Sequence, residues 1–460
     1  MTGPDDVQGR ALPKNGAVTY SSPHMTAIPL PHPSDDPQPS AIAALLHGRL
    51  GLPSGGATWT PGLIALIVYV WTIHSYKAPI GTLAVVVLLG SIVFSGQRVR
   101  CPPPVLFLGL FLLWSTLGGV QSEYWSTVSE RLQEFWKVWL IFFGAVNVLR
   151  TPSQIRAFAI AYLGIFAAYP IRGILFNIVT GQHHEGRYAW NFVFSNANDF
   201  ATLTVLMLGL TIVALQSALK TWQRVAAAAG ALILPVCVIF TQSRAGFLGL
   251  ALVAILLLLR TRPNLRLLAL LAVAGGTIAF FAPPKVWERI GGIRELETAD
   301  ASAHDRYTIW KVAMTISAEH PVFGIGTGAY PKAHFDYSLT RQEWSNVQGY
   351  WATHSTWLCV LAETGFPGLI LYLAMIGAVF RRTALARRRL PPEFEEWSLD
   401  LRYLESGLAG FMMCASFGVY QFLPFLYLYL ALAWVMAGVF ESEAERMTVG
   451  QLQEETLTPG

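Results

Sequence analysis

Long apolar segments recur along most of this 460-residue chain, and they constrain its fold more than any other feature. An apolar α-helix of about 20 residues matches the thickness of a membrane's hydrocarbon core. Only 13% of the residues are charged and 53% are hydrophobic, whereas charged residues make up about 25% of a soluble globular domain. The chain therefore predicts an all-α polytopic membrane protein, and its composition excludes an ordinary soluble enzyme.

The hydropathy pattern predicts about twelve transmembrane helices. We place them at residues 61–75, 79–95, 104–120, 132–149, 155–179, 198–217, 222–240, 244–260, 265–282, 364–381, 403–421 and 424–440. The Pro-rich residues 1–58 are expected to form a disordered cytoplasmic tail. Residues 59–441 then form one transmembrane domain, and residues 442–460 form a cytoplasmic C-terminal tail.

The orientation follows from the positive charges, because Lys and Arg concentrate in cytoplasmic connections. Alternate connections carry them, at Arg98, Arg100, Arg150, Arg156, Lys220, Arg224, Arg260, Arg262, Arg266, Arg381, Arg382, Arg387, Arg388 and Arg389. Both termini are then cytoplasmic. The long connection 283–363, before the third-last span, lies outside, which in a bacterium is the periplasmic side of the inner membrane.

This outer connection has helical patterning of its own. A helix is expected to begin near Asp305, with apolar residues at helical spacing, and to end at His320-Pro321. A second amphipathic stretch starts near His354, with Thr353 as a possible N-cap. We expect both helices to lie on the outer face of the membrane.

Charged residues within the spans are few, and such residues are usually functional. Five such residues lie well within the spans, and the topology places all five toward the outer face: Glu134, Lys137, Arg172, Asp199 and Arg244. Arg187 lies in the outer connection between the fifth and sixth spans. Converging arginines suit a phosphate or pyrophosphate, because a guanidinium offers paired donors and keeps its charge when partly desolvated. The alternative is that each arginine only extends from a helix end toward water.

His354 is the best candidate for a general base. Its place at the start of a helix disfavours the imidazolium form, and a neutral imidazole is what abstraction of a hydroxyl proton requires. A pyrophosphate nearby would favour protonation, so the balance stays open. The alternative is a loop histidine that only makes structural hydrogen bonds.

Other patterns argue against metal, cofactor and nucleic-acid binding. The net charge of +4 is small for a nucleic-acid binder, and the four cysteines are scattered. No outer segment contains Asp-x-Asp, which a divalent-metal diphosphate clamp would use. Gly324-Ile325-Gly326-Thr327-Gly328 is interpreted as tight turns, and His183-His184-Glu185 as a solvated loop.

Several segments together resemble the signature of the O-antigen ligase superfamily over roughly residues 60–440. They are Gln242-Ser243-Arg244-Ala245-Gly246, His320-Pro321-Val322-Phe323-Gly324, Thr353-His354-Ser355-Thr356-Trp357-Leu358 and Glu363-Thr364-Gly365-Phe366-Pro367-Gly368. Arg172-Gly173-Ile174-Leu175, Arg187 and Asn198 are also similar to a branch of O-glycosylation ligases.

The resemblance implies a metal-independent, inverting glycosyltransferase with a GT-C-like membrane fold. Its donor would be a glycan on undecaprenyl pyrophosphate, and its acceptor lipid A–core. By this resemblance Arg187 and Arg244 bind the donor pyrophosphate and His354 is the catalytic base. Further substrate contacts are expected at Arg172, Asn198, Asp199 and Arg306.

Other functions remain open at this point. An O-antigen polymerase or a protein O-oligosaccharyltransferase would use the same donor with another acceptor. An anion transporter would use the arginine-lined bundle, but no pair of interrupted helices in matched halves supports it. The sugar, the acceptor and the oligomeric state are not determined by the sequence.

Overall fold

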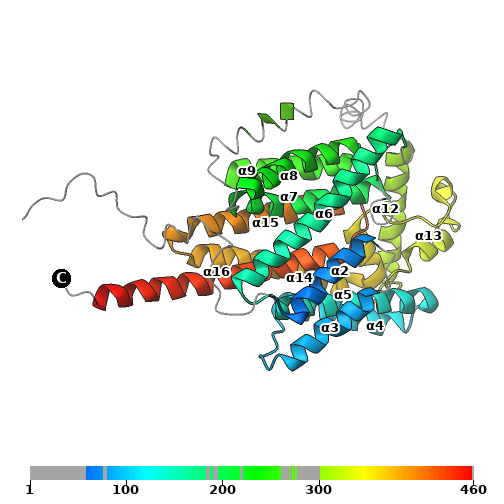
Figure 1. Cartoon of the computed structure of the whole chain (residues 1–460). Coiled ribbons are helices and arrows are strands. Elements are labelled where there is room, and N and C mark those ends of the chain that lie inside the picture. The colour runs from blue at the N-terminus through cyan, green and yellow to red at the C-terminus, as the bar shows by residue number, and fades with distance from the viewer. Residues whose placement is uncertain are drawn as a thin grey trace, which may run out of the picture.

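The computed structural model describes most of the expected membrane domain. It covers residues 59–75, 80–182, 187–189, 195–217, 221–260 and 301–457, with five further residues between 269 and 276. The expected N-terminal tail, most of the expected span 265–282 and the start of the outer connection lie outside the described residues. Most of the long helices run roughly along one axis (Figure 1).

Eleven of the expected spans coincide with a helix. The helices are α2 (Pro61–Ser75), α3 (Ile80–Phe94), α4 (Pro103–Gly119), α5 (Trp125–Val148), α6 (Pro152–Thr180), α7 (Ala197–Ser217), α8 (Thr221–Phe240), α9 (Arg244–Arg260), α14 (Thr356–Arg389), α15 (Glu395–Ala415) and α16 (Pro424–Leu457). Helix α16 continues into the expected C-terminal tail. Helix α15 begins before residue 403, because its charged first turns lower the hydropathy but suit a helix N-terminus.

Five helices, namely α6, α7, α8, α14 and α16 up to Val449, are long and apolar enough to cross a membrane. Helices α2, α3 and α4 are apolar but have only 15 to 17 residues. At the rise of an α-helix, 17 residues extend about 26 Å, somewhat less than a hydrocarbon core of about 30 Å. The chain is thus a helical membrane protein.

Local sequence explains where several helices begin. Thr60 accepts a hydrogen bond from the backbone N–H of Leu63 at 3.2 Å, and Pro61 occupies the first helical position, as the sequence predicts. Thr151 and Gln154 form a capping box at the start of α6. These side chains satisfy backbone donors that would otherwise lack partners within the bilayer.

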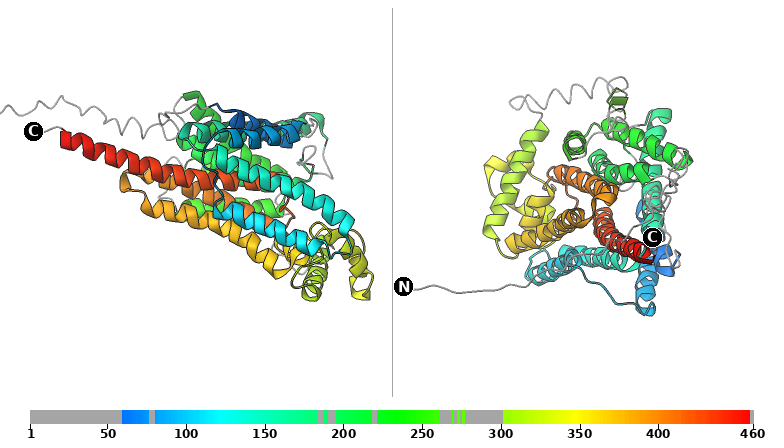
Figure 2. Two further views of the ribbon diagram at one scale, coloured as in Figure 1. Left: turned by 90° about the horizontal axis from the view of Figure 1, so that it is seen from below. Right: turned by 90° about the vertical axis from the view of Figure 1, so that its left-hand side faces the viewer.

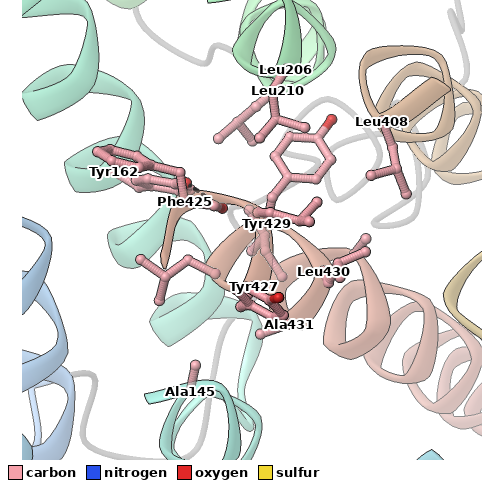
Figure 3. Packing of buried hydrophobic residues seen from close by; sticks show 14 of the residues in the cluster. Ala145, Tyr162, Leu206, Leu210, Leu408, Phe425, Tyr427, Tyr429, Leu430 and Ala431 are labelled. Atoms are coloured by element: carbon pink, nitrogen blue, oxygen red, sulfur yellow. Dashed lines mark hydrogen bonds between the residues drawn. The ribbon is translucent and has the colours of Figure 1, made fainter. Parts of the chain in front are cut away.

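The core is built around α7 and α16, whose side chains are largely buried (Figure 3). The hydroxyls of Tyr162 and Tyr429 donate to the backbone carbonyls of Phe425 and Leu404, at 2.8 and 2.9 Å. Helices α7 and α15 approach closely at Gly209, where a Cβ atom would lie 2.4 Å from the carbonyl oxygen of Tyr403. Small residues allow such close packing of membrane helices.

Basic residues at the ends of several helices gather at one end of the bundle. Arg260 and Arg387 both contact Glu405, at 3.7 and 3.1 Å, and Arg382 contacts Glu441 at 2.5 Å. These contacts join the ends of α9 and α14 to α15 and α16. Connections that the sequence assigns to one side of the membrane therefore meet in space.

The opposite end is covered by α12 (Ala301–Glu319), α13 (Tyr330–Ser338) and the 3₁₀ helix η2 (Gln342–Val347) (Figures 1 and 2). Helix α12 crosses the ends of the long helices in Figure 1. It confirms the first helix expected in the outer connection, ending before His320-Pro321. Helices α13 and η2 were not expected, because their short segments lack a clear apolar period.

The second expected helix of this connection forms the first turns of α14 and is not a separate element. Its residues Val360, Leu361 and Ala362 are buried between other elements. Helix α14 then bends at Gly365, whose φ of 68° is non-helical, and continues into the membrane. Pro367 follows this bend and lacks a backbone donor, which is compatible with a break in the helix.

Candidate functional site

His354 lies in the turn that precedes α14, at the end of the bundle covered by α12. Its φ of 50° is unusual for a residue with a side chain. The N-cap of α14 is Ser355, which accepts from the N–H of Leu358, and not Thr353 as the sequence suggested. A helix has one N-cap residue, and here it is Ser355. The hydroxyl of Thr353 instead donates to the backbone carbonyl of Ser355 at 2.9 Å.

The carbonyl of Thr353 accepts a hydrogen bond from the indole Nε1 of Trp310 on α12, at 2.9 Å. This contact ties the turn that carries His354 to the covering helix. Half-buried Arg306 lies one helical turn before Trp310. Burial, followed by the charge of Arg306, lowers the pKa of His354 from 6.5 to about 4. The imidazole is therefore neutral near pH 7, as a general base must be.

Arg306 is also close to Arg244 at the start of α9. Burial lowers the pKa of Arg306, the charge of Tyr420 raises it, and the neighbouring Arg244 lowers it. Two guanidinium groups that repel each other in a partly buried site are stabilised when an anion lies between them. Arg306 thus links His354 to the arginine predicted in the turn before α9.

That turn is tightly built. Gln242, two residues before Arg244, has a φ of 53°. In the part of the chain that the structure describes, Gln242 and His354 are the two non-glycine residues with positive φ. Such backbone strain concentrates at functional sites, where the surrounding structure maintains it.

Arg187 joins the same turn through two hydrogen bonds. Its Nε donates to the carbonyl of Thr241 at 2.9 Å, and its Nη2 donates to Oδ1 of Asn198 at 3.0 Å. Ser243, next to Arg244, donates to the same Asn198 oxygen at 2.8 Å. One amide at the start of α7 therefore orients both Arg187 and the turn that carries Arg244.

Asp199 follows Asn198 and interacts with a residue that the sequence did not single out. The hydroxyl of Tyr420 hydrogen-bonds the carboxylate of Asp199 and accepts from Thr202 at 3.1 Å. The backbone N–H of Tyr420 donates to Thr356 Oγ1 at 3.0 Å, at the start of α14. Tyr420 therefore connects α7 to α14, the helix that follows His354. In the sequence it stands at the end of a predicted span, where aromatic residues are common at the membrane interface.

The glycine-rich segment after His320 packs on the bend in α14. The N–H groups of Ile325 and Gly326 donate to the carbonyls of Ala362 and Glu363, at 3.0 and 2.9 Å. Gly324, Gly326 and Gly328 all have positive φ, which confirms tight turns. Those two backbone donors are therefore already paired and do not point to a phosphate.

Glu363, in the Glu-Thr-Gly segment, has a structural position. It is buried, and its Oε1 accepts from the N–H of Tyr330 at 3.3 Å, at the start of α13. The carboxylate therefore holds α13 against α14.

Other predicted residues lie apart from these contacts. Arg172 is exposed on α6, where it lines an open groove with Leu175 and Phe176. Glu134 pairs with Arg131 at 3.0 Å. The segment His183-His184-Glu185 lies outside the described residues. Among the residues described, no group of three or more His, Cys, Asp or Glu side chains is arranged to hold a metal ion.

A family model described as O-antigen ligase (Wzy_C) matches residues 228–373. The matched segment runs from α8 to the middle of α14 and contains Arg244, Arg306 and His354. A search of curated proteins finds no match. The match agrees with the motifs around these residues and with a helical membrane fold, and it supports the O-antigen ligase superfamily.

Proposed function

We propose that this glycosyltransferase transfers a glycan from undecaprenyl pyrophosphate to lipid A–core. The superfamily supports O-antigen ligase or polymerase chemistry in general. The observation that carries the specific proposal is the convergence of His354, Arg306, Arg244 and Arg187 from four separate parts of the chain. A neutral base beside several cations suits an alcohol acceptor and a pyrophosphate leaving group.

In this proposal Arg187 and Arg244 bind the donor pyrophosphate, with Arg306 as a further contact. Guanidinium donors match phosphate oxygens, and they neutralise the negative charge that grows as the leaving group departs. Asn198 and Ser243 act on the same step by orienting Arg187 and the α9 turn. This charge neutralisation needs no metal ion.

His354 then removes the proton from the acceptor hydroxyl. The hydroxyl oxygen bonds to the anomeric carbon as the bond from that carbon to the pyrophosphate oxygen breaks on the opposite face, so the configuration inverts. General-base assistance of this kind contributes about 10²- to 10⁴-fold. The constrained turn at His354 keeps the imidazole in position for this attack.

The lipid tail of the donor is assigned to the side of α6. An apolar cavity of about 320 Å³ lies between α6, α7 and α8, with Leu163, Leu210 and Leu234 in its wall. A second groove continues along α6 past Arg172 to Thr180. The cavity and the groove both follow the long axis of α6, as the lipid tail of the donor would in the bilayer. Arg172 lies toward the end of α6 that is nearer the proposed pyrophosphate site.

The proposal includes the membrane arrangement. Twelve spans with a GT-C-like course would cross the bacterial inner membrane, with both termini in the cytoplasm. The covered end with α12 would face the periplasm. Its support is the gathering of Arg260, Arg382 and Arg387 at the opposite end, since positive charges mark cytoplasmic connections.

The test is a reconstituted reaction. Purified protein in detergent is incubated with a glycan on undecaprenyl pyrophosphate and with lipid A–core, without added metal. We expect product from the wild type and from Lys332→Ala, an exposed control on α13, and none from His354→Ala or Arg244→Ala. Normal transfer by folded His354→Ala or Arg244→Ala protein would contradict the assignment.

The polymerase alternative uses the same site with a second lipid-linked glycan as acceptor. Deletion of the gene separates the two reactions. Loss of a ligase leaves lipid-linked polymer, whereas loss of a polymerase leaves single repeat units on the lipid.

A further inference from the structure

A second cleft lies beside the proposed active site, between α12 and η2. It has a volume of about 340 Å³. Its wall is mainly aromatic and charged, and the residues used below are Tyr307, Trp310, Lys311, Arg341, Glu343 and Trp344. A hydrogen bond from Asn346 to Asp305, at 2.9 Å, holds η2 against the start of α12. The cleft is of the size that binds a small ligand or one unit of a larger one.

The aromatic side chains in this cleft present both apolar faces and polar atoms. Tyr307 is 56% exposed, although it belongs to a helix with a well-packed inner face. Trp344 is 2% exposed, yet its indole N–H has no hydrogen-bond partner among the described residues. A buried indole donor normally has a partner, so the Trp344 N–H is an unsatisfied donor in the wall of the cleft.

Charged groups lie over these rings. The Lys311 ammonium is 4.6 Å from the centroid of the Tyr307 ring, and the Arg341 guanidinium is 4.6 Å from that of Trp344. Glu343 lies 3.5 Å from Arg341. Two cations and one carboxylate leave the cleft with a net positive charge, which favours an anionic ligand.

Trp310 joins the cleft to the proposed active site. Its ring lines the cleft, and its Nε1 donates to Thr353, next to His354. Arg306, four residues earlier on α12, lies about 6 Å away along the helix axis. A glycan chain that reaches His354 therefore passes close to the cleft.

We propose that the cleft between α12 and η2 binds an acidic sugar unit that carries phosphate or carboxylate and belongs to one of the two glycans. The inference rests on the proposed function, because it takes the cleft ligand to be part of a substrate. The exposed face of Tyr307 packs on the C–H groups of a sugar ring, and Lys311 and Arg341 bind the anionic group.

Binding is measured by calorimetry on the full chain in detergent. The probes are a phosphorylated core oligosaccharide, the same oligosaccharide after dephosphorylation, and a lipid-free O-antigen oligosaccharide that contains glucuronic acid. We expect Lys311→Ala, which removes one charged contact, to weaken binding of the preferred acidic probe about tenfold. Tyr307→Ala removes the aromatic face and should weaken binding about 2- to 10-fold. Lys332→Ala should bind as the wild type does.

The two acidic probes distinguish acceptor from donor as the source of the sugar. The proposal would be overturned if the wild type bound the phosphorylated and dephosphorylated core oligosaccharides equally and did not bind the glucuronic acid probe. Unchanged affinity in both cleft variants would also overturn it. Transfer assays separate this inference from the catalytic one: Arg244→Ala should still bind the oligosaccharide without transferring it. A wild type that binds but never transfers would refute the proposed function and leave the cleft assignment standing.

Discussion

The guanidinium of Arg306 on α12 acts on the imidazole of His354, 48 residues later in the chain, closely enough to help lower its pKa. Burial is the larger cause, and Arg306 adds to it. Both effects disfavour the protonated ring. They act in the same direction as the helix N-terminus, which also disfavours the imidazolium form.

The pH dependence of transfer should reflect this environment. Since the pKa of His354 is about 4, the base stays neutral as the pH falls from 7 to 5, and kcat/KM should decline only near pH 4. Arg306→Gln removes one of the two lowering effects, so the acidic limb should move upward toward 6.5. The measurement is a profile of kcat/KM against pH for both proteins. An acidic limb at the same pH in both would rule out electrostatic control by Arg306.

Asn198 should matter through the groups that it orients. Asn198→Ala removes the oxygen that accepts from Arg187 and Ser243, so we expect transfer to fall about 10- to 100-fold, in line with losing hydrogen bonds to a charged group. Asn198→Asp keeps that oxygen and should retain most of the activity. Steady-state kinetics with varied donor would show the loss. Equal activity of the two variants would contradict the orienting role.

The bend in α14 should depend on Gly365. An alanine there would need a positive φ and would place its Cβ 2.2 Å from the carbonyl oxygen of Val322. We expect Gly365→Ala to destabilise the protein by about 1–3 kcal/mol, measured as a lower Tm in detergent. Gly377→Ala on the same helix meets no atom within 4 Å and should leave Tm unchanged or slightly raised. A similar Tm for both variants would argue against the bend as a structural requirement.

Tyr420 should support activity through its hydroxyl. Tyr420→Phe removes the hydrogen bonds to Asp199 and Thr202 while keeping the ring, and we expect kcat/KM to fall about tenfold. Tyr429→Phe is the matched control, because its hydroxyl donates to Leu404 within the core. That control should lower Tm without a comparable effect on turnover. Equal kinetic effects of the two changes would mean that Tyr420 acts only through stability.

Features that depend on short stretches of chain could be predicted. The end of α12 before His320-Pro321 follows from the conformational restriction that proline imposes on the preceding residue. The turns at Gly324, Gly326 and Gly328 follow from the freedom of glycine at positive φ. In contrast, the burial of the first turns of α14 was missed, because their neighbours come from α12 and α13.

The site residues also divide into those that the sequence could predict and those that it could not. Arg187, Arg244 and His354 could be selected by residue type, predicted topology and family resemblance. Tyr420 and the orienting role of Asn198 could not, since each depends on partners dozens or hundreds of residues away. Hydrogen bonds over such separations leave no local periodicity.

The sequence alone determined that this chain is a helical membrane protein and where most of its helices run. Apolar content and backbone hydrogen bonding are local properties, and a bilayer permits few structures that satisfy them. Only the tertiary structure decided that Arg306 lies near enough to His354 to lower its pKa and that Asn198 accepts from both Arg187 and Ser243. These relationships depend on how α7, α9, α12 and α14 pack, and packing is set by the shapes of all the contacting side chains together.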